Sequence, residues 1–234
     1  MEKENKQFIK LPTKKSSEKS DLVPEEEFIY IGLRSFLNKD TKQCNPSYRA
    51  IADRLKIKGV DTISKYLKSL EKKGYIKIHD NGLKKSKDYE FIKELPNFEK
   101  FKPEFITSEN FTFQQKSFLT SIQRLQYIDE ETGLGKIAYQ EFEIADKINT
   151  SPSIVNKRIK ELSNKGIVTV TKTNVTDTET GLKKNLYSFD LTKYNPIVQV
   201  LVKHELDIQD IISVLSEEQK LEIERRRKQR EILI

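Results

Sequence analysis

Two stretches of the chain combine amine, hydroxyl and amide side chains on one helix face with aliphatic side chains on the other. The aliphatic residues recur at spacings of three and four, which is the period of an amphipathic helix: Ile63, Leu67 and Leu70 in the first stretch, and Val155, Ile159 and Leu162 in the second. Such a helix packs its aliphatic side inward and leaves the polar side free. Exposed amines and amides can bind phosphate oxygens and the edges of bases, so the chemistry indicated is nucleic-acid binding.

The free side of the first helix is predicted to carry five polar residues: Thr62, Ser64, Lys65, Lys68 and Lys72. Residues near the start of a docked helix reach base edges, so we expect Ser64 and Lys65 to contact bases. Lys68 and Lys72 lie further along the helix and are expected at phosphates. The alternative is a lysine face that contacts only solvent.

The free side of the second helix is predicted to carry Ser153, Asn156, Lys157 and Lys160. An asparagine can form two hydrogen bonds with adenine, which makes Asn156 the candidate for base recognition. Arg158 is expected to reach phosphate or guanine. Ordinary solvent contact by Asn156 remains the alternative.

Similar elements flank the two helices and would hold them in place. A short helix comes before each one, over 47–55 and 142–148, and a turn joins it to the next helix. Glycines Gly74 and Gly166 follow, and each is succeeded by residues that alternate as in a strand.

Each repeat then ends in a predicted β-hairpin. The first pairs 75–79 with 89–92 across Asn81-Gly82, and its tip carries Lys84, Lys85 and Lys87. The second pairs 167–172 with 186–191 around a longer wing over 173–185. Lys183 and Lys184 lie near the far end of that wing.

In these motifs the chain resembles the winged helix-turn-helix superfamily of DNA-binding proteins. The residues that carry the resemblance are Ala145 to Ile148, the seven-residue step from Ile148 to Val155, and Leu162 followed by Gly166 and Ile167. The first repeat has one extra residue between Leu55 and Ile63, which predicts an irregular turn. The resemblance implies that the second motif helix and the wing of each repeat contact DNA. Two such domains in one chain also resemble, in architecture, the replication initiators of plasmids and phages.

The predicted fold is mainly α with small β wings, an α+β arrangement of two tandem winged-helix domains followed by a helical extension. The expected divisions are a disordered basic tail (1–22), the first domain (23–95), a linker (96–110), the second domain (111–191) and a C-terminal helical extension (192–234). The first helix of this extension is expected to begin at Asn195-Pro196.

Composition narrows the function classes. The formal net charge is +7, and residues 23–95 hold much of it, with 16 Lys and Arg against 11 Asp and Glu. A basic surface attracts polyanions, although a lysine-rich composition alone is an alternative explanation. No apolar run approaches the roughly 20 residues that span a bilayer, and the first residues lack the apolar stretch of a signal peptide. A single cysteine, Cys44, forms no internal disulfide, so a cytoplasmic, nucleoid-associated location is expected.

Two histidines and one cysteine are too few and too dispersed for a zinc site of Cys and His ligands. The eight glycines form no phosphate-binding loop and no nucleophile elbow. The sequence therefore predicts no enzyme, no cofactor and no metal.

The expected function is sequence-specific binding of double-stranded DNA, with transcriptional regulation as the first interpretation. A plasmid or phage replication initiator that binds origin repeats is the second. The third is an interaction module in which the winged helices bind protein. Residues 196–234 are the predicted contact for a homodimer or for a replication or transcription protein.

Overall fold

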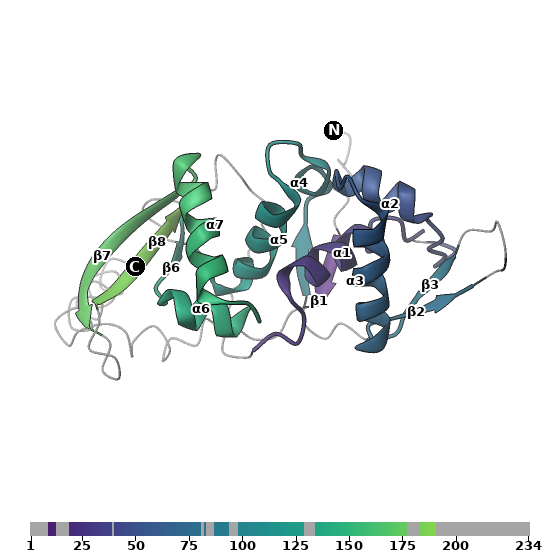
Figure 1. Ribbon diagram of the computed structural model, residues 1–234, viewed down its shortest axis with the longest axis horizontal. Helices are drawn as coiled ribbons and strands as arrows, with labels where there is room; N and C mark the ends of the chain where they lie inside the picture. The colour runs from purple at the N-terminus through teal and green to yellow at the C-terminus, as the bar shows by residue number, and fades with distance from the viewer. Residues whose placement is uncertain are drawn as a thin grey trace, which may run out of the picture.

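The structure is a computed structural model that describes residues 9–12, 19–38, 40–80, 82, 87–93, 98–128, 134–176 and 183–190. Figure 1 shows helices in the middle of an elongated molecule and a small antiparallel sheet at each end. Helices α1 and α5 lie at the centre, α3 and α7 flank them on opposite sides, and the hairpins lie outermost.

The first unit consists of three helices and a hairpin. Its elements are α1 (Pro24–Arg34), α2 (Tyr48–Leu55), α3 (Val60–Lys72), β2 (Ile76–His79) and β3 (Asp88–Phe91). Three acids fill the first turn of α1 behind a proline at its first position, which suits the positive end of the helix dipole. The two strands pair antiparallel, with Ile76 opposite Phe91 and His79 opposite Asp88.

The second unit repeats this order with a larger sheet. Its elements are α5 (Phe113–Ile122), the 3-10 helix η1 (Gln123–Leu125), β5 (Tyr127–Ile128), β6 (Gly135–Ile137), α6 (Glu141–Lys147), α7 (Pro152–Asn164), β7 (Val168–Thr176) and β8 (Lys183–Phe189). The strands form one antiparallel sheet in the order β5-β6-β8-β7. The long pair β7 and β8 is the hairpin predicted from the sequence, whereas β5 and β6 had no counterpart in the prediction.

The segments predicted as tail and linker contain regular structure. Strand β1 (Ile9–Pro12) lies in the predicted tail, and β4 (Phe98–Phe101) lies in the predicted linker. The two strands pair antiparallel, and the short helix α4 (Pro103–Thr107) follows β4. The prediction of a disordered 1–22 is therefore wrong for 9–12 and 19–22, and the predicted linker over 96–110 contains β4 and α4. The physical reason is that both segments supply apolar side chains to the core, including Leu11, Leu22 and Phe101.

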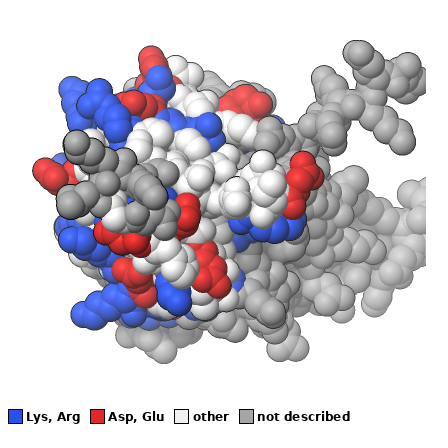
Figure 2. Space-filling model, turned by 90° about the vertical axis from the view of Figure 1, so that its right-hand side faces the viewer, with Lys and Arg blue, Asp and Glu red and all other residues white. Residues whose placement is uncertain are grey.

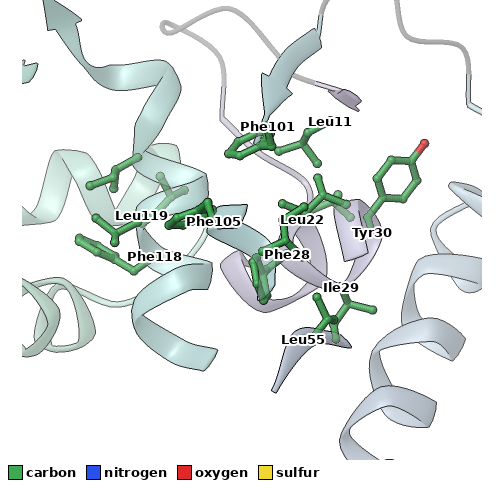
Figure 3. Close-up of a cluster of buried hydrophobic side chains, with 14 of the residues drawn as sticks. Leu11, Leu22, Phe28, Ile29, Tyr30, Leu55, Phe101, Phe105, Phe118 and Leu119 are labelled. Carbon is green, nitrogen blue, oxygen red and sulfur yellow. The ribbon is translucent and has the colours of Figure 1, made fainter. Parts of the chain in front are cut away.

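One hydrophobic core joins the two units. Figure 3 shows Leu22, Phe28 and Ile29 from the first unit close to Phe105 and Leu119 from the second. The Phe28 ring lies 6.4 Å from that of Phe105 and 5.9 Å from that of Phe113, between ring centroids. Helix α1 packs directly on α5, so the units share a buried interface rather than a flexible tether.

The prediction of a mainly helical fold with small antiparallel sheets is confirmed, and the two motif helices lie where the periodicity placed them. One helix is shorter than predicted. The apolar spacing over 112–128 predicts one long helix, whereas the chain leaves the helix at Ile122 and passes through a 3-10 turn into β5. The predicted C-terminal extension over 192–234 lies outside the described residues.

Candidate nucleic-acid interface

The first helix-turn-helix is set by a cap at one end of α2 and a left-handed residue at the other. The Ser47 hydroxyl accepts a hydrogen bond from the Ala50 amide at 3.1 Å, which satisfies a free donor of the first turn. At the other end Lys56 has a φ of 59°, and the Ile57 amide donates back to the Ala52 carbonyl at 2.9 Å. Residues 57–59 then lead into α3, so the extra residue found in the sequence lies in this turn.

Helix α3 presents its predicted faces. Ile63, Leu67 and Leu70 are completely buried. Lys65, Lys68 and Lys72 are exposed, and Thr62 and Ser64 are half-buried beside them. The predicted contact residues of α3 thus lie together on its open side, between its start and its last turn.

Tyrosine on α3 has a structural role. Tyr66 is half-buried and its ring lies 6.3 Å from that of Phe113, so it contributes to the junction between the units. The Lys65 amine lies 5.2 Å from the centre of the Tyr66 ring. This contact is a cation–π interaction of the Lys65 amine, and the Lys65 side chain remains exposed.

The second helix-turn-helix is built in the same way. Asn149 takes the left-handed conformation with a φ of 54°, and the Thr150 amide donates to the Ala145 carbonyl at 2.9 Å. Ser151 caps α7 by accepting a hydrogen bond from the Ile154 amide at 3.4 Å. Asparagine adopts positive φ more readily than most residues, which suits it to this turn.

Helix α7 also buries the predicted aliphatic side chains and exposes the predicted polar ones. Val155 and Leu162 are completely buried, and Ile159 is 6% exposed. A shallow groove on the outer side is lined by polar and charged side chains of α7 together with one from α6: Ser153, Asn156, Lys157, Lys160, Glu161, Asn164 and Glu141. The groove therefore has acids as well as lysines at its rim.

Arg158 is paired with an acid on the same helix. Its guanidinium Nη1 donates to both Glu161 carboxylate oxygens, at 2.9 and 2.7 Å, and the side chain is only 15% exposed. Glu161 in turn accepts a hydrogen bond from the Gln115 side chain at 3.4 Å. Arg158 thus lies on the flank of α7 that faces α5, and its charge is already paired.

Helices α3 and α7 end in the same glycine cap. Gly74 and Gly166 have φ values of 72° and 66°, in the left-handed region that favours glycine. The Tyr75 amide donates to the Leu70 carbonyl and the Ile167 amide to the Leu162 carbonyl, each at 3.0 Å. These caps turn the chain sharply into β2 and β7, so the hairpins start next to the helices.

The wings are described only in part. Lys87 is half-buried, with its amine 5.3 Å from the Tyr48 ring and 3.7 Å from an Asp80 carboxylate oxygen. Lys84 and Lys85 lie outside the described residues. Lys183 and Lys184 belong to β8 by their backbone, and their side chains lie outside the description.

The surface charge at the end of the first unit is mixed. Figure 2 shows this end of the molecule, with most of its Lys and Arg toward the edge that faces the viewer in Figure 1. Asp and Glu lie among them and further inward. The positive charge is therefore concentrated toward one side of this unit.

A polar cluster at the junction of the units was not predicted. The carboxylate of Glu27 on α1 accepts hydrogen bonds from the hydroxyls of Ser20 and Ser121 and from Arg124 Nη1, the last at 3.0 Å. Arg124 also donates to the Lys147 carbonyl at 2.7 Å, at the end of α6. In the sequence, Glu25 to Glu27 behind Pro24 indicate only the first turn of a helix, so no local pattern marks Glu27 as a buried residue of this junction.

Lys116 on α5 has the corresponding role toward α2. Its amine is completely buried and donates to the carbonyls of Leu55, Ile106 and Ser108 at 2.9 to 3.0 Å. Burial, together with the nearby positive charge of Lys56, lowers the pKa of Lys116 to about 8, while Glu109 opposes the change. Lys116 satisfies carbonyls at the end of α2 and around α4, so it helps to fix the first helix-turn-helix against the second unit.

Within the part of the chain that the structure describes, no three His, Cys, Asp or Glu side chains cluster in a way that could hold a metal ion. No helix among the described residues is long and apolar enough to cross a membrane.

Comparison with known proteins supports the geometry of the first unit. Residues 21–76 match the profile of a family described as "Helix-turn-helix domain". No curated protein matched the chain. The matched residues run from just before α1 to the start of β2, which covers all three helices of the first unit. Residues 21–76 are therefore a helix-turn-helix domain, the class of domain that places a helix against DNA.

Proposed function

We propose that the protein binds double-stranded DNA in a sequence-specific manner through α3 and α7, and that it acts as a transcriptional regulator. The observation that carries the proposal is the shared design of these helices. Each is 13 residues long, buries its aliphatic face and exposes lysines at matching positions, Lys65 and Lys68 on α3 and Lys157 and Lys160 on α7. One side of each helix is therefore open to a duplex.

The second unit is proposed to be a winged helix. Its order of helices and strands, with β6 beside β8 and β8 beside β7, joins a helix-turn-helix to a three-strand wing sheet. On this proposal the winged-helix domains occupy 23–95 and 111–191. Ser64, Lys65 and Asn156 would contact bases, and the lysines further along α3 and α7, together with the wing lysines, would contact phosphates.

Salt-dependent binding tests this proposal. The wild-type chain should bind duplex DNA with an affinity that falls steeply as salt rises, because bound cations are released when lysines replace them. Changing Lys68→Ala and Lys157→Ala together removes two proposed phosphate contacts. It should lower affinity and reduce the slope of log affinity against log salt by about 2, at about one unit per phosphate contact.

Lys42→Ala is the matched control, because it removes an exposed positive charge outside α3 and α7. It should leave the salt slope nearly unchanged. Equal affinity for the wild type and the double variant would overturn the proposed surfaces. Failure of the wild-type chain to bind duplex DNA would overturn the function.

The acids beside α7 favour one second candidate, a protein-binding role for that helix. Glu141 and Glu161 line the same groove as Lys157 and Lys160, and Arg158 is neutralised by Glu161. A protein adaptor would show little affinity for DNA at any salt concentration, so the experiment above separates the two functions. Sequencing of the genomic DNA that the protein retains separates a regulator, bound at promoters, from an initiator, bound at tandem origin repeats.

A further inference from the structure

We infer that the two units form an internal two-fold pair, and that one chain recognises a single DNA site made of two inverted, related but unequal half-sites. This inference rests on the proposed DNA-binding function and adds the orientation of the half-sites and the stoichiometry. It is carried by a symmetry in the contacts between the units.

Strands β1 and β4 give the first observation. Helix α1 starts at Pro24 and α5 starts at Phe113. The same difference in residue number separates Ile9, the start of β1, from Phe98, the start of β4. The strands are therefore equivalent segments of the two units. They pair with Ile9 opposite Phe101 and Pro12 opposite Phe98. Each end of one strand faces the opposite end of its equivalent, as a two-fold axis through the centre of the pair requires.

Helices α1 and α5 give the second observation, because these equivalent helices pack on each other. The contacts around them cross in both directions. The segment before α1 reaches the end of α6, where Lys19 pairs with Asp146. The segment before α5 reaches the end of α2, where Glu109 pairs with Lys56 at 2.8 Å. Like surfaces therefore meet like surfaces, which is the pattern of a two-fold interface.

The units also repeat each other's internal contacts. Lys73 and Lys165 follow α3 and α7, and their amines donate to the carbonyls of Asp21 and Asn110, both at 2.7 Å. The Glu26 carboxylate accepts from the Val23 amide at 2.9 Å, and the Gln115 side chain accepts from the Thr112 amide at 3.1 Å. The same side chains then contact α3 and α7, at Ser69 and Glu161. Each recognition helix is thus held in the same way against its own first helix.

The direction of the recognition helices places them on one side of the molecule. In Figure 1, α3 runs downward from α2 to β2 at one end, and α7 runs upward from α6 to β7 at the other. A two-fold axis that relates α3 to α7 must exchange the two ends of the molecule and reverse the direction of each helix. That axis runs along the direction of view in Figure 1. Such an axis keeps α3 and α7 at the same depth, so they can face one duplex together.

The distance between α3 and α7 suits successive turns of one major groove. Helices α3, α1, α5 and α7 form a row in which neighbours pack. Three steps of about 8–10 Å give about 24–30 Å between α3 and α7. Half-sites bound on one face of B-DNA lie about 34–36 Å apart, and a two-fold protein matches half-sites in inverted orientation. The row is slightly shorter than one turn, so a modest bend of the duplex toward the protein is expected.

The exposed residues predict how the half-sites differ. Aligning Gly74 with Gly166 places Lys65 on Lys157 and Lys68 on Lys160, so both helices carry lysines at the same two positions. The same alignment places Ser64 on Asn156. Serine bonds several bases, whereas asparagine prefers adenine. The half-site under α7 should therefore require an adenine at the position where the half-site under α3 tolerates other bases.

Selection from random-sequence duplex DNA with the full chain tests the inference. The expected product is two inverted half-sites with centres about one helical turn apart, bound by one chain per duplex. Half-sites in direct orientation, a single contiguous site, or two chains per duplex would each overturn the inference while leaving the proposed function intact. No enrichment of any duplex, together with no salt-dependent binding, is the separate failure of the proposed function.

Reciprocal exchange sharpens the test. Asn156→Ser should relax the adenine preference in one half-site only, and Ser64→Asn should impose it on the other. A bidentate pair contributes about 1–3 kcal/mol of discrimination, so the preference should change by about 5- to 150-fold. Position 156 is exposed and 64 half-buried, and circular dichroism with denaturant unfolding checks that both variants fold. A preference that changes at both half-sites, or at neither in two folded variants, would contradict the assignment.

Discussion

The buried ion pair between Glu27 and Arg124 should hold the two units together. The two side chains are only 3% and 6% exposed, and Nη1 of Arg124 lies 3.0 Å from Glu27 Oε1. Glu27→Gln keeps the shape but leaves the guanidinium without its counter-charge in the core. Breaking a buried pair on one side costs about 3–5 kcal/mol. That is a large fraction of the roughly 5–15 kcal/mol by which a typical domain is stable.

Thermal and denaturant unfolding measure this loss. At about 2–4 °C per kcal/mol for a chain of this size, the midpoint Tm of Glu27→Gln should fall by about 6–20 °C. Glu25→Gln is the matched control, since Glu25 lies in the same turn but is only half-buried. Its effect should stay within about 0.5 kcal/mol, as at other surface positions.

A double variant distinguishes a coupled pair from two independent losses. Glu27→Leu with Arg124→Met removes both charges, and apolar replacement of a buried pair is often neutral. The Lys147 carbonyl, which loses Arg124, still accepts the Ser20 amide at 2.9 Å. The double variant should therefore be more stable than Glu27→Gln. The reasoning is wrong if Glu27→Gln loses less than about 1 kcal/mol, or if the free energies of Glu27→Leu and Arg124→Met simply add.

Two further predictions concern Lys116 and the cap of α3. The folded chain holds the pKa of Lys116 near 8 by burial, below its unfolded value. The charged form of Lys116 therefore destabilises the folded protein below pH 8. In denaturant titrations, the free energy of unfolding of the wild type minus that of Lys116→Met should rise from pH 8 to pH 10. The thiol of Cys44, whose pKa burial raises to about 12, lowers the stability of both chains above pH 9 and cancels in the difference. A flat difference would exclude this titration. Gly74→Ala places a Cβ in open space but keeps φ at +72°, so it should cost about 1–2 kcal/mol in chemical denaturation, and an unchanged midpoint would contradict the backbone explanation.

Helices α3 and α7 were predictable because the sequence patterns that indicate them are local. Three buried aliphatic residues at helical spacing, a capping serine before α7 and a glycine after each helix fix the position and the open face of α3 and α7. The wing strands β2 and β3 follow from strand alternation around Asn81-Gly82 for the same reason. Local propensity and global packing agree at these elements.

The junction was not predictable, because its contacts join residues far apart in the sequence. Leu11 and Phe101 lie in short stretches with few apolar residues, and neither stretch alone can offset the entropy of ordering. Strands β1 and β4 form because they pair with each other. Lys116 is likewise of a residue type that is ordinarily exposed, and only the carbonyls of α2 and α4 explain its burial.

The asymmetry of the junction follows from the two units belonging to one chain. The shift that relates α1 to α5 places Glu27 on Lys116, so equivalent positions at one interface carry opposite charges. In a homodimer each position must hold the same residue twice, which would bring two acids or two amines into the same buried region. Here Glu27 holds Arg124 against the end of α6, while Lys116 itself reaches the end of α2. The freedom that permits this difference in the core also permits Ser64 and Asn156 to differ at the surface. A covalently joined pair can therefore match an unequal inverted site, and can bind it in one orientation only.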